Sequence, residues 1–135
     1  MPPADKPTWP KDVEAITLFV EDLPRTRQFY VDVFDVPLVY EDANSVVFKF
    51  GAAMINLLAT TAARGLIEPA PVGGRDAGSR LQLSIFVDDV DAVCADLAGR
   101  GVELVNGPMD REWRMRTACF ADPAGHIWEV AQELH

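Results

Sequence analysis

The sequence lacks several features that define particular classes of protein. Its 135 residues include two cysteines, which cannot make a disulfide framework, and neither belongs to a Cys-x-x-Cys pair. We expect Cys94 and Cys119 to be free and buried, which favours a reducing cytoplasm. No stretch approaches the ~20 apolar residues of a membrane span, and the start has no apolar core of a secretory signal. A Ser-His-Asp set, a phosphate-cradling glycine loop and a dinucleotide fingerprint are also missing.

Positive charge is scarce as well. The chain has 12 basic and 21 acidic residues, for a net charge of −9. Such a balance repels phosphate backbones, so we expect no nucleic-acid partner, and no membrane partner either. Apolar residues make up 49% of the chain, which is enough for the core of one domain without disulfide or metal staples.

The first half of the chain predicts one helix and four strands. Four prolines in the first ten residues indicate an extended arm over 1–13. Asp22 is the expected N-cap of a helix, with Pro24 in its first turn. Strands are predicted from β-branched and aromatic composition at 15–20, 37–40, 45–50 and 53–58.

The second half repeats this order after a stretch rich in glycine and proline, 60–79, which is expected to be a linker or a covering loop. A helix is predicted between the cap Asp88-Asp89 and the glycines Gly99 and Gly101. Strands are predicted at 81–87, 102–105, 116–121 and 127–131.

An internal repeat relates the two halves. Residues 17–23 (TLFVEDL) match 84–90 (SIFVDDV), and residues 36–40 match 102–106 at nearly the same offset. The predicted fold is therefore α+β, with two βαβββ repeats forming a curved mixed sheet around a cleft. Repeat one spans 14–59 and repeat two 80–132, within a single domain of 14–135. Because each helix covers one face of its sheet, the other face must be covered or must enclose a cavity.

These residues resemble a known family. The strand, acidic cap and helix with Phe29-Tyr30, and the closing 120–129 (FADPAGHIWE), are similar to the vicinal oxygen chelate superfamily of glyoxalases, bleomycin-resistance proteins and dioxygenases. The resemblance covers 14–132. It implies a small-molecule cleft, a homodimer and, in catalytic members, a divalent metal held at four equivalent places.

Those four places carry few side chains that could bind a metal in this chain. The resemblance puts Ala15, Asn56, Gln82 and Glu129 there, which is one carboxylate, two amides and one methyl group. Zinc requires imidazole, thiolate or carboxylate, and magnesium or manganese as a rule requires more than one charged ligand. We therefore predict a metal-free site without a cofactor, although a weakly held divalent ion is left open.

Several other residues are candidates for binding a ligand. Glu129 either orients a ligand or acts as a general base, or else forms an inherited polar cluster with Gln82 or Asn56. Thr17, Phe19, Ser84 and Phe86 share strand parity with Ala15 and Gln82 and are expected to line the cleft floor, although the two phenylalanines suit a core equally well.

Trp113, Arg114 and Arg116 lie at the expected mouth of the cleft. They suit a flat or anionic ligand, or an ordinary loop anchored by its tryptophan. His126, on the opposite strand face from Glu129, is expected to be a solvent-facing turn residue, and His135 a frayed terminal one.

Three functions remain open from the sequence. The first is metal-independent binding of a small apolar or aromatic molecule in the cleft between the repeats. The second is lyase, isomerase or dioxygenase chemistry, either through a metal with unusual ligands or through Glu129. The third is an interaction module that pairs as a homodimer. The sequence does not decide whether the cleft forms within one chain or across two.

Overall fold

The computed structural model describes residues 7–135, and each repeat contributes one helix and four strands. The first repeat contains β1 (Ala15–Val20), α1 (Leu23–Phe34), β2 (Leu38–Glu41), β3 (Ser45–Phe50) and β4 (Ala53–Ala59). The second contains β5 (Gln82–Phe86), α3 (Val90–Gly99), β6 (Leu104–Asp110), β7 (Met115–Ala121) and β8 (Ile127–Glu133). The order confirms the predicted α+β fold of two βαβββ units.

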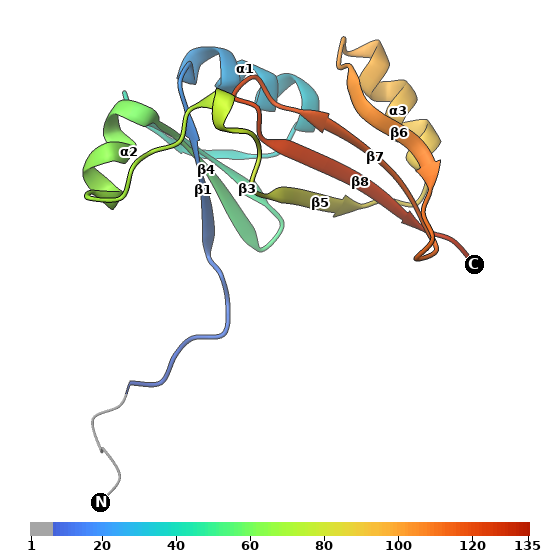
Figure 1. Ribbon diagram of the computed structural model, residues 1–135, viewed down its shortest axis with the longest axis horizontal. Helices are drawn as coiled ribbons and strands as arrows, with labels where there is room; N and C mark the ends of the chain where they lie inside the picture. The colour runs from blue at the N-terminus through green and yellow to red at the C-terminus, as the bar shows by residue number, and fades with distance from the viewer. Residues whose placement is uncertain (1–6) are drawn as a thin grey trace, which may run out of the picture.

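Each repeat forms its own mixed sheet, and the two sheets lie at an angle to each other (Figure 1). The strand order is β1-β4-β3-β2 in the first sheet and β5-β8-β7-β6 in the second. In both sheets the first strand lies at an edge and runs parallel to the last strand of its repeat. Within residues 7–135 the two sheets do not pair with each other.

The two helices begin in the same way. The Asp22 carboxylate accepts a hydrogen bond from the Arg25 backbone N–H at 3.1 Å, and Asp89 accepts one from Ala92 at 3.1 Å. These bonds satisfy N–H groups that the first turn of a helix leaves free. The second residue of each acidic pair in the repeated sequence, Asp22 or Asp89, is therefore an N-cap.

One hydrophobic core joins the two repeats. We call the face of each sheet that packs on α1 or α3 its inner face, and the opposite face its outer face. Inner-face residues of both sheets, among them Phe48 and Trp128, form one buried cluster with residues of both helices. Tyr30 of α1 touches Phe48 of the first sheet and Trp128 of the second. The two units therefore share one interior.

A buried hydrogen-bond relay crosses the same junction. The Trp128 indole N–H donates to the Tyr30 hydroxyl at 2.9 Å, and this hydroxyl donates to the Asp122 carboxylate at 2.8 Å. The second oxygen of Asp122 accepts from the backbone N–H groups of Ala124 and His126, both at 2.9 Å. Burial is the largest cause that raises the pKa of Tyr30, so the hydroxyl stays protonated and able to donate. The Asp-Pro-Ala-Gly segment is thus a turn held by a carboxylate that also anchors the other repeat.

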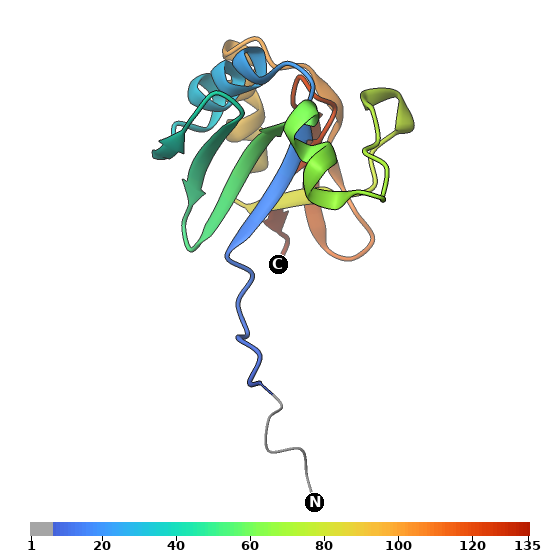
Figure 2. The same cartoon turned by 90° about the vertical axis from the view of Figure 1, so that its left-hand side faces the viewer.

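The predicted arm and the predicted linker differ in secondary structure. Residues 7–14 form no helix or strand and extend from the body (Figure 2), while the rest of the predicted arm lies outside the described residues. The predicted linker is partly helical, with α2 (Thr60–Ile67) and a short 3-10 turn (Arg75–Ala77). α2 packs on β1 and β4, where the outer-face residue Leu58 and Ala63 of the helix are buried.

Both cysteines are free and buried, as predicted. Among the described residues, no helix is long and apolar enough to cross a membrane.

Candidate functional site

The predicted site residues lie on the outer faces of the two sheets, in two equivalent pairs. Thr17 stands opposite Asn56 in the register of β1 and β4, and Ser84 stands opposite Glu129 in the register of β5 and β8. The Asn56 amide donates to the Thr17 hydroxyl at 3.4 Å, and the Ser84 hydroxyl donates to the Glu129 carboxylate at 2.9 Å. Each sheet therefore carries one half of the predicted site.

The remaining predicted residues of β1 and β5 are solvent-accessible to different degrees. Ala15 and Gln82 are exposed, Phe19 is half-buried and Phe86 is 70% exposed. Phe86 therefore does not belong to the core, and the core position that its sequence pattern also allowed is wrong. Gln82 has no hydrogen bond to Glu129, whose partner is Ser84.

The four places that the family resemblance assigns to a metal do not fit one. Within residues 7–135 no three or more His, Cys, Asp or Glu side chains gather in a way that could hold an ion. The Asn56 side-chain oxygen is buried without a partner, but Ala15 offers no donor atom and one Glu129 oxygen is already bonded to Ser84. A divalent ion needs several charged or strongly polar ligands at once, so this donor set is inadequate.

A cavity of about 570 Å³ lies between the two repeats. It is lined by Ile16, Phe34, Val36, Phe50, Gly51, Ala53 and Ile55 from the first repeat and by Leu83, Ser84, Ile85 and Trp128 from the second. The Trp128 ring stacks on Phe50 at 5.1 Å between centroids and lies 4.6 Å from Phe34. Of the predicted ligand-binding residues, Ser84 alone borders this cavity.

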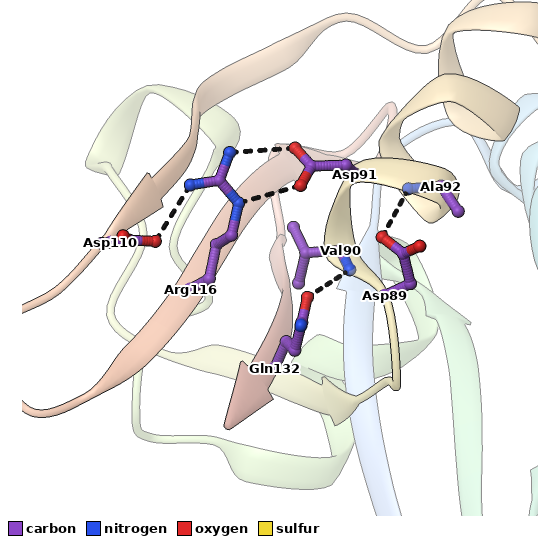
Figure 3. Close-up of polar contacts among 7 residues, drawn as sticks. All are labelled: Asp89, Val90, Asp91, Ala92, Asp110, Arg116 and Gln132. Atoms are coloured by element: carbon purple, nitrogen blue, oxygen red, sulfur yellow. Dashed lines mark hydrogen bonds and ion pairs between the residues drawn. The ribbon is translucent and has the colours of Figure 1, made fainter. Parts of the chain in front are cut away.

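Arg116 is held in an ion-pair network on the inner side of the second sheet. Its guanidinium bonds both oxygens of Asp91, at the start of α3, and one oxygen of Asp110 at 2.9 Å (Figure 3). These bonds raise the pKa of Arg116 and lower the pKa of Asp91. Gln132, which pairs with Arg116 in register, caps α3 on the same side through the Val90 N–H. Arg116 therefore points away from the Glu129 face and is occupied by carboxylates.

The hairpin between β6 and β7 places the other two predicted residues at its tip. Trp113 is 65% exposed, and Arg114 adopts a left-handed backbone conformation with φ of 64°. Their predicted ligand role is compatible with this exposure and stays a prediction.

One outer-face residue was missed by the sequence analysis. Arg111 donates from Nε to the Thr117 hydroxyl at 2.9 Å and from its terminal nitrogen to the Asn106 side-chain oxygen at 3.3 Å. Thr117 shares the outer face with Glu129, because both belong to the same alternation of β7 and β8. The prediction ended the sixth strand at residue 105, whereas β6 runs to Asp110, so the hairpin in which Arg111 directly follows β6 was not recognised.

His126 is also placed differently from the expectation. The ring is half-buried, and its Nε2 lies 2.9 Å from the Phe19 carbonyl oxygen. Because a carbonyl can only accept, Nε2 carries the proton in this contact. The histidine therefore ties the last turn of the second repeat to β1, an edge strand of the first sheet.

Comparisons with known proteins agree with this architecture. The sequence model of the Glyoxalase/Bleomycin resistance protein/Dioxygenase superfamily matches residues 13–130. The uncharacterized protein YraH of Bacillus subtilis is 32% identical over 124 residues, which is 88% of this chain and 96% of YraH.

Two crystal structures have the same fold. A glyoxalase/bleomycin resistance protein/dioxygenase from Nocardioides superposes with a TM-score of 0.83 at 21% identity, covering 97% of this chain and 88% of its own. The lactoylglutathione lyase from Agrobacterium tumefaciens gives 0.73 at 23% identity, covering 91% and 94%. The repeated βαβββ units, the Asp-Pro-Ala-Gly turn held by its buried aspartate and the match over 13–130 establish that this chain belongs to the glyoxalase/bleomycin resistance protein/dioxygenase superfamily.

Proposed function

We propose that this protein binds a small apolar or aromatic molecule in the cavity between its two repeats, without a metal. The observation that carries the proposal is the cavity itself, whose volume of about 570 Å³ falls in the range usual for small-molecule sites. Its lining contains no charged side chain and one hydroxyl, that of Ser84. Such a lining favours a ligand that gives up little hydration when it enters.

The aromatic part of the wall supports a planar ligand. Trp128 cannot turn freely, because its indole N–H is bonded to the buried Tyr30 hydroxyl. Phe34 and Phe50 contact the same ring. A fixed group of three rings offers faces and edges for stacking at little cost in side-chain entropy.

Ser84 gives the cavity one point of polar contact with the outer face. Its hydroxyl proton is directed to Glu129, which leaves the lone pairs of the hydroxyl oxygen for a donor on the ligand. The absence of adequate metal ligands among the four equivalent places supports recognition by shape and apolar contact alone.

The proposal can be tested with N-phenyl-1-naphthylamine, an uncharged aromatic probe whose fluorescence rises in apolar surroundings. We expect saturable binding that EDTA does not change. Ala53→Phe places a ring in the cavity wall and should weaken binding at least tenfold, whereas Ala52→Phe adds the same ring at the neighbouring exposed position and should not. Leu83→Phe is a second blocking variant. Equal affinity of both blocking variants, the Ala52→Phe control and wild type would refute the assignment.

We also propose that two copies pair, as predicted from the family resemblance. The support is the edge strand β5 and the residue before it, where Phe86 is 70% and Leu81 45% exposed. An exposed ring such as that of Phe86, on the same strand face as Ser84, is suited to burial against a second chain. Multi-angle light scattering should give twice the chain mass for wild type and a lower mass for Phe86→Lys. A wild-type mass of one chain at micromolar concentration would overturn the pairing.

A further inference from the structure

The outer face of the second sheet carries a row of polar side chains that the cavity does not include. The row crosses all four strands, since Ser84 pairs with Glu129, Glu129 with Cys119, and Cys119 with Asn106. Residues that are paired in register project from the same face. Asn106 at the β6 end of this row is exposed.

Arg111 lies over the β6 and β7 end of this row. Its guanidinium bridges two strands by bonding the Thr117 hydroxyl at 2.9 Å and the Asn106 amide oxygen at 3.3 Å. Thr117 is 2% exposed, so the Nε end of the guanidinium contacts a buried hydroxyl, and Arg111 as a whole is half-buried. The Trp113 ring lies 5.8 Å from the guanidinium carbon. Two hydrogen bonds and an aromatic contact therefore fix the orientation of the side chain.

Neutral oxygens alone accept these hydrogen bonds. In the described part of the chain, the ion pairs belong to Arg27, Arg100 and Arg116. Arg111 has none, although the protein carries nine more acidic than basic residues. A guanidinium has five N–H donors, and two bonds leave several of them for an acceptor from outside.

The carboxylates nearest in the fold do not cancel this charge. Asp110 is bonded to Arg116 on the opposite face, and Glu112 makes no ion pair in the structure described. Glu129 shares the outer face on β8, the strand next to β7, but its register partner there is Cys119 and not Thr117, and one of its oxygens accepts a hydrogen bond from Ser84. Glu133, which stands opposite Met115 on the same face, makes no ion pair in the described part of the chain.

We infer that Arg111 and Trp113 form a binding site for a small aromatic carboxylate. The guanidinium would take the carboxylate through charge-assisted hydrogen bonds, and the exposed indole would stack on the ring of the ligand. Neither residue lines the apolar cavity between the repeats, so this site does not depend on the function proposed above.

Benzoate and benzamide are matched probes, because they share a planar ring and differ in charge. Binding is followed by NMR titration of the Arg111 Nε–H and Trp113 indole N–H signals. We expect benzoate to bind at least tenfold more tightly than benzamide, since a hydrogen bond to a charged group contributes about 1.5–3 kcal/mol.

Variants then assign the effect to one side chain. Arg111→Gln should weaken benzoate binding about tenfold or more, whereas Arg64→Gln removes the same charge from an exposed position on α2 and should change it less than twofold. Arg111→Lys keeps the charge and the fold and should recover part of the affinity. Ala53→Phe should bind benzoate like wild type, which separates this site from the cavity. Equal binding of benzoate and benzamide, or equal losses in the Arg111→Gln and Arg64→Gln variants, would overturn the proposal.

Discussion

Replacing Tyr30 by phenylalanine removes a single oxygen from the middle of the buried relay. The Tyr30 hydroxyl accepts from Trp128 and donates to Asp122, so Tyr30→Phe leaves one buried donor and one buried acceptor each without a partner. A buried polar group left without its hydrogen bond costs about 1–3 kcal/mol. Asp122 keeps its two backbone bonds, so its loss falls at the lower end of that range. The sum is about 2–4 kcal/mol, a large part of the ~5–15 kcal/mol stability of a typical domain.

Urea unfolding followed by circular dichroism measures this loss. The midpoint should fall in Tyr30→Phe while the dependence on urea concentration stays unchanged, because the surface exposed on unfolding is the same. Tyr40→Phe is the matched control, since Tyr40 is 54% exposed and its hydroxyl bonds Asp42 at the surface. We expect less than about 0.5 kcal/mol from the control. A loss of the same size in both variants would show that the relay does not connect the repeats energetically.

Three further predictions concern the backbone, the surface charges and metal content. Gly107→Ala should lower the melting temperature by many degrees, because its Cβ would lie 2.5 Å from the Thr117 carbonyl oxygen at a φ of 87°, whereas Gly99→Ala meets no atom within 4 Å and should be tolerated. The pKa of Asp91 is lowered in the folded state by Arg116, so this pair stabilises the protein above the unfolded pKa of the carboxyl, and the contribution is lost as the pH falls. The melting temperature of wild type should therefore fall more than that of Asp91→Asn between about pH 6 and about pH 3, and parallel curves would contradict this sign. Elemental analysis of the purified protein should find far less than one divalent ion per chain, and a stoichiometric ion that EDTA removes with a loss of stability would disprove the metal-free reading.

The fold was predictable because its signals are local and occur twice. Helix caps such as Asp22 and Asp89 and the alternation of apolar residues in strands depend on residues close in sequence. The same pattern occurs in both halves, so the prediction for one half supports the prediction for the other. The helix α2 was not predicted, because it lies in a stretch that also contains glycine and proline. Its stability comes from contact with β1 and β4, which the local sequence does not reveal.

The candidate site was predicted less completely. Strand parity put Thr17 and Ser84 on the same strand faces as Ala15 and Gln82. The partner expected for Glu129 was Gln82 or Asn56, whereas the register sets Ser84 opposite Glu129 and the two are hydrogen-bonded. The cavity between the repeats was not foreseen in detail, since it depends on the angle between the two sheets. Arg111 was missed because the length of a hairpin strand is set by its partner β7 and not by its own composition.

The position of α2 makes the two duplicated halves unequal. This helix buries Leu58 and Ala63 against the outer face of the first sheet, and within residues 7–135 no helix packs on the outer face of the second. The two outer faces therefore differ: the first is partly covered by a helix of its own chain, whereas the second carries the exposed Ser84 hydroxyl and Asn106 amide beside the Glu129 carboxylate. Substitutions at the α2 contact of the first half should accordingly act on stability, whereas polar substitutions on the outer face of the second half should leave stability nearly unchanged.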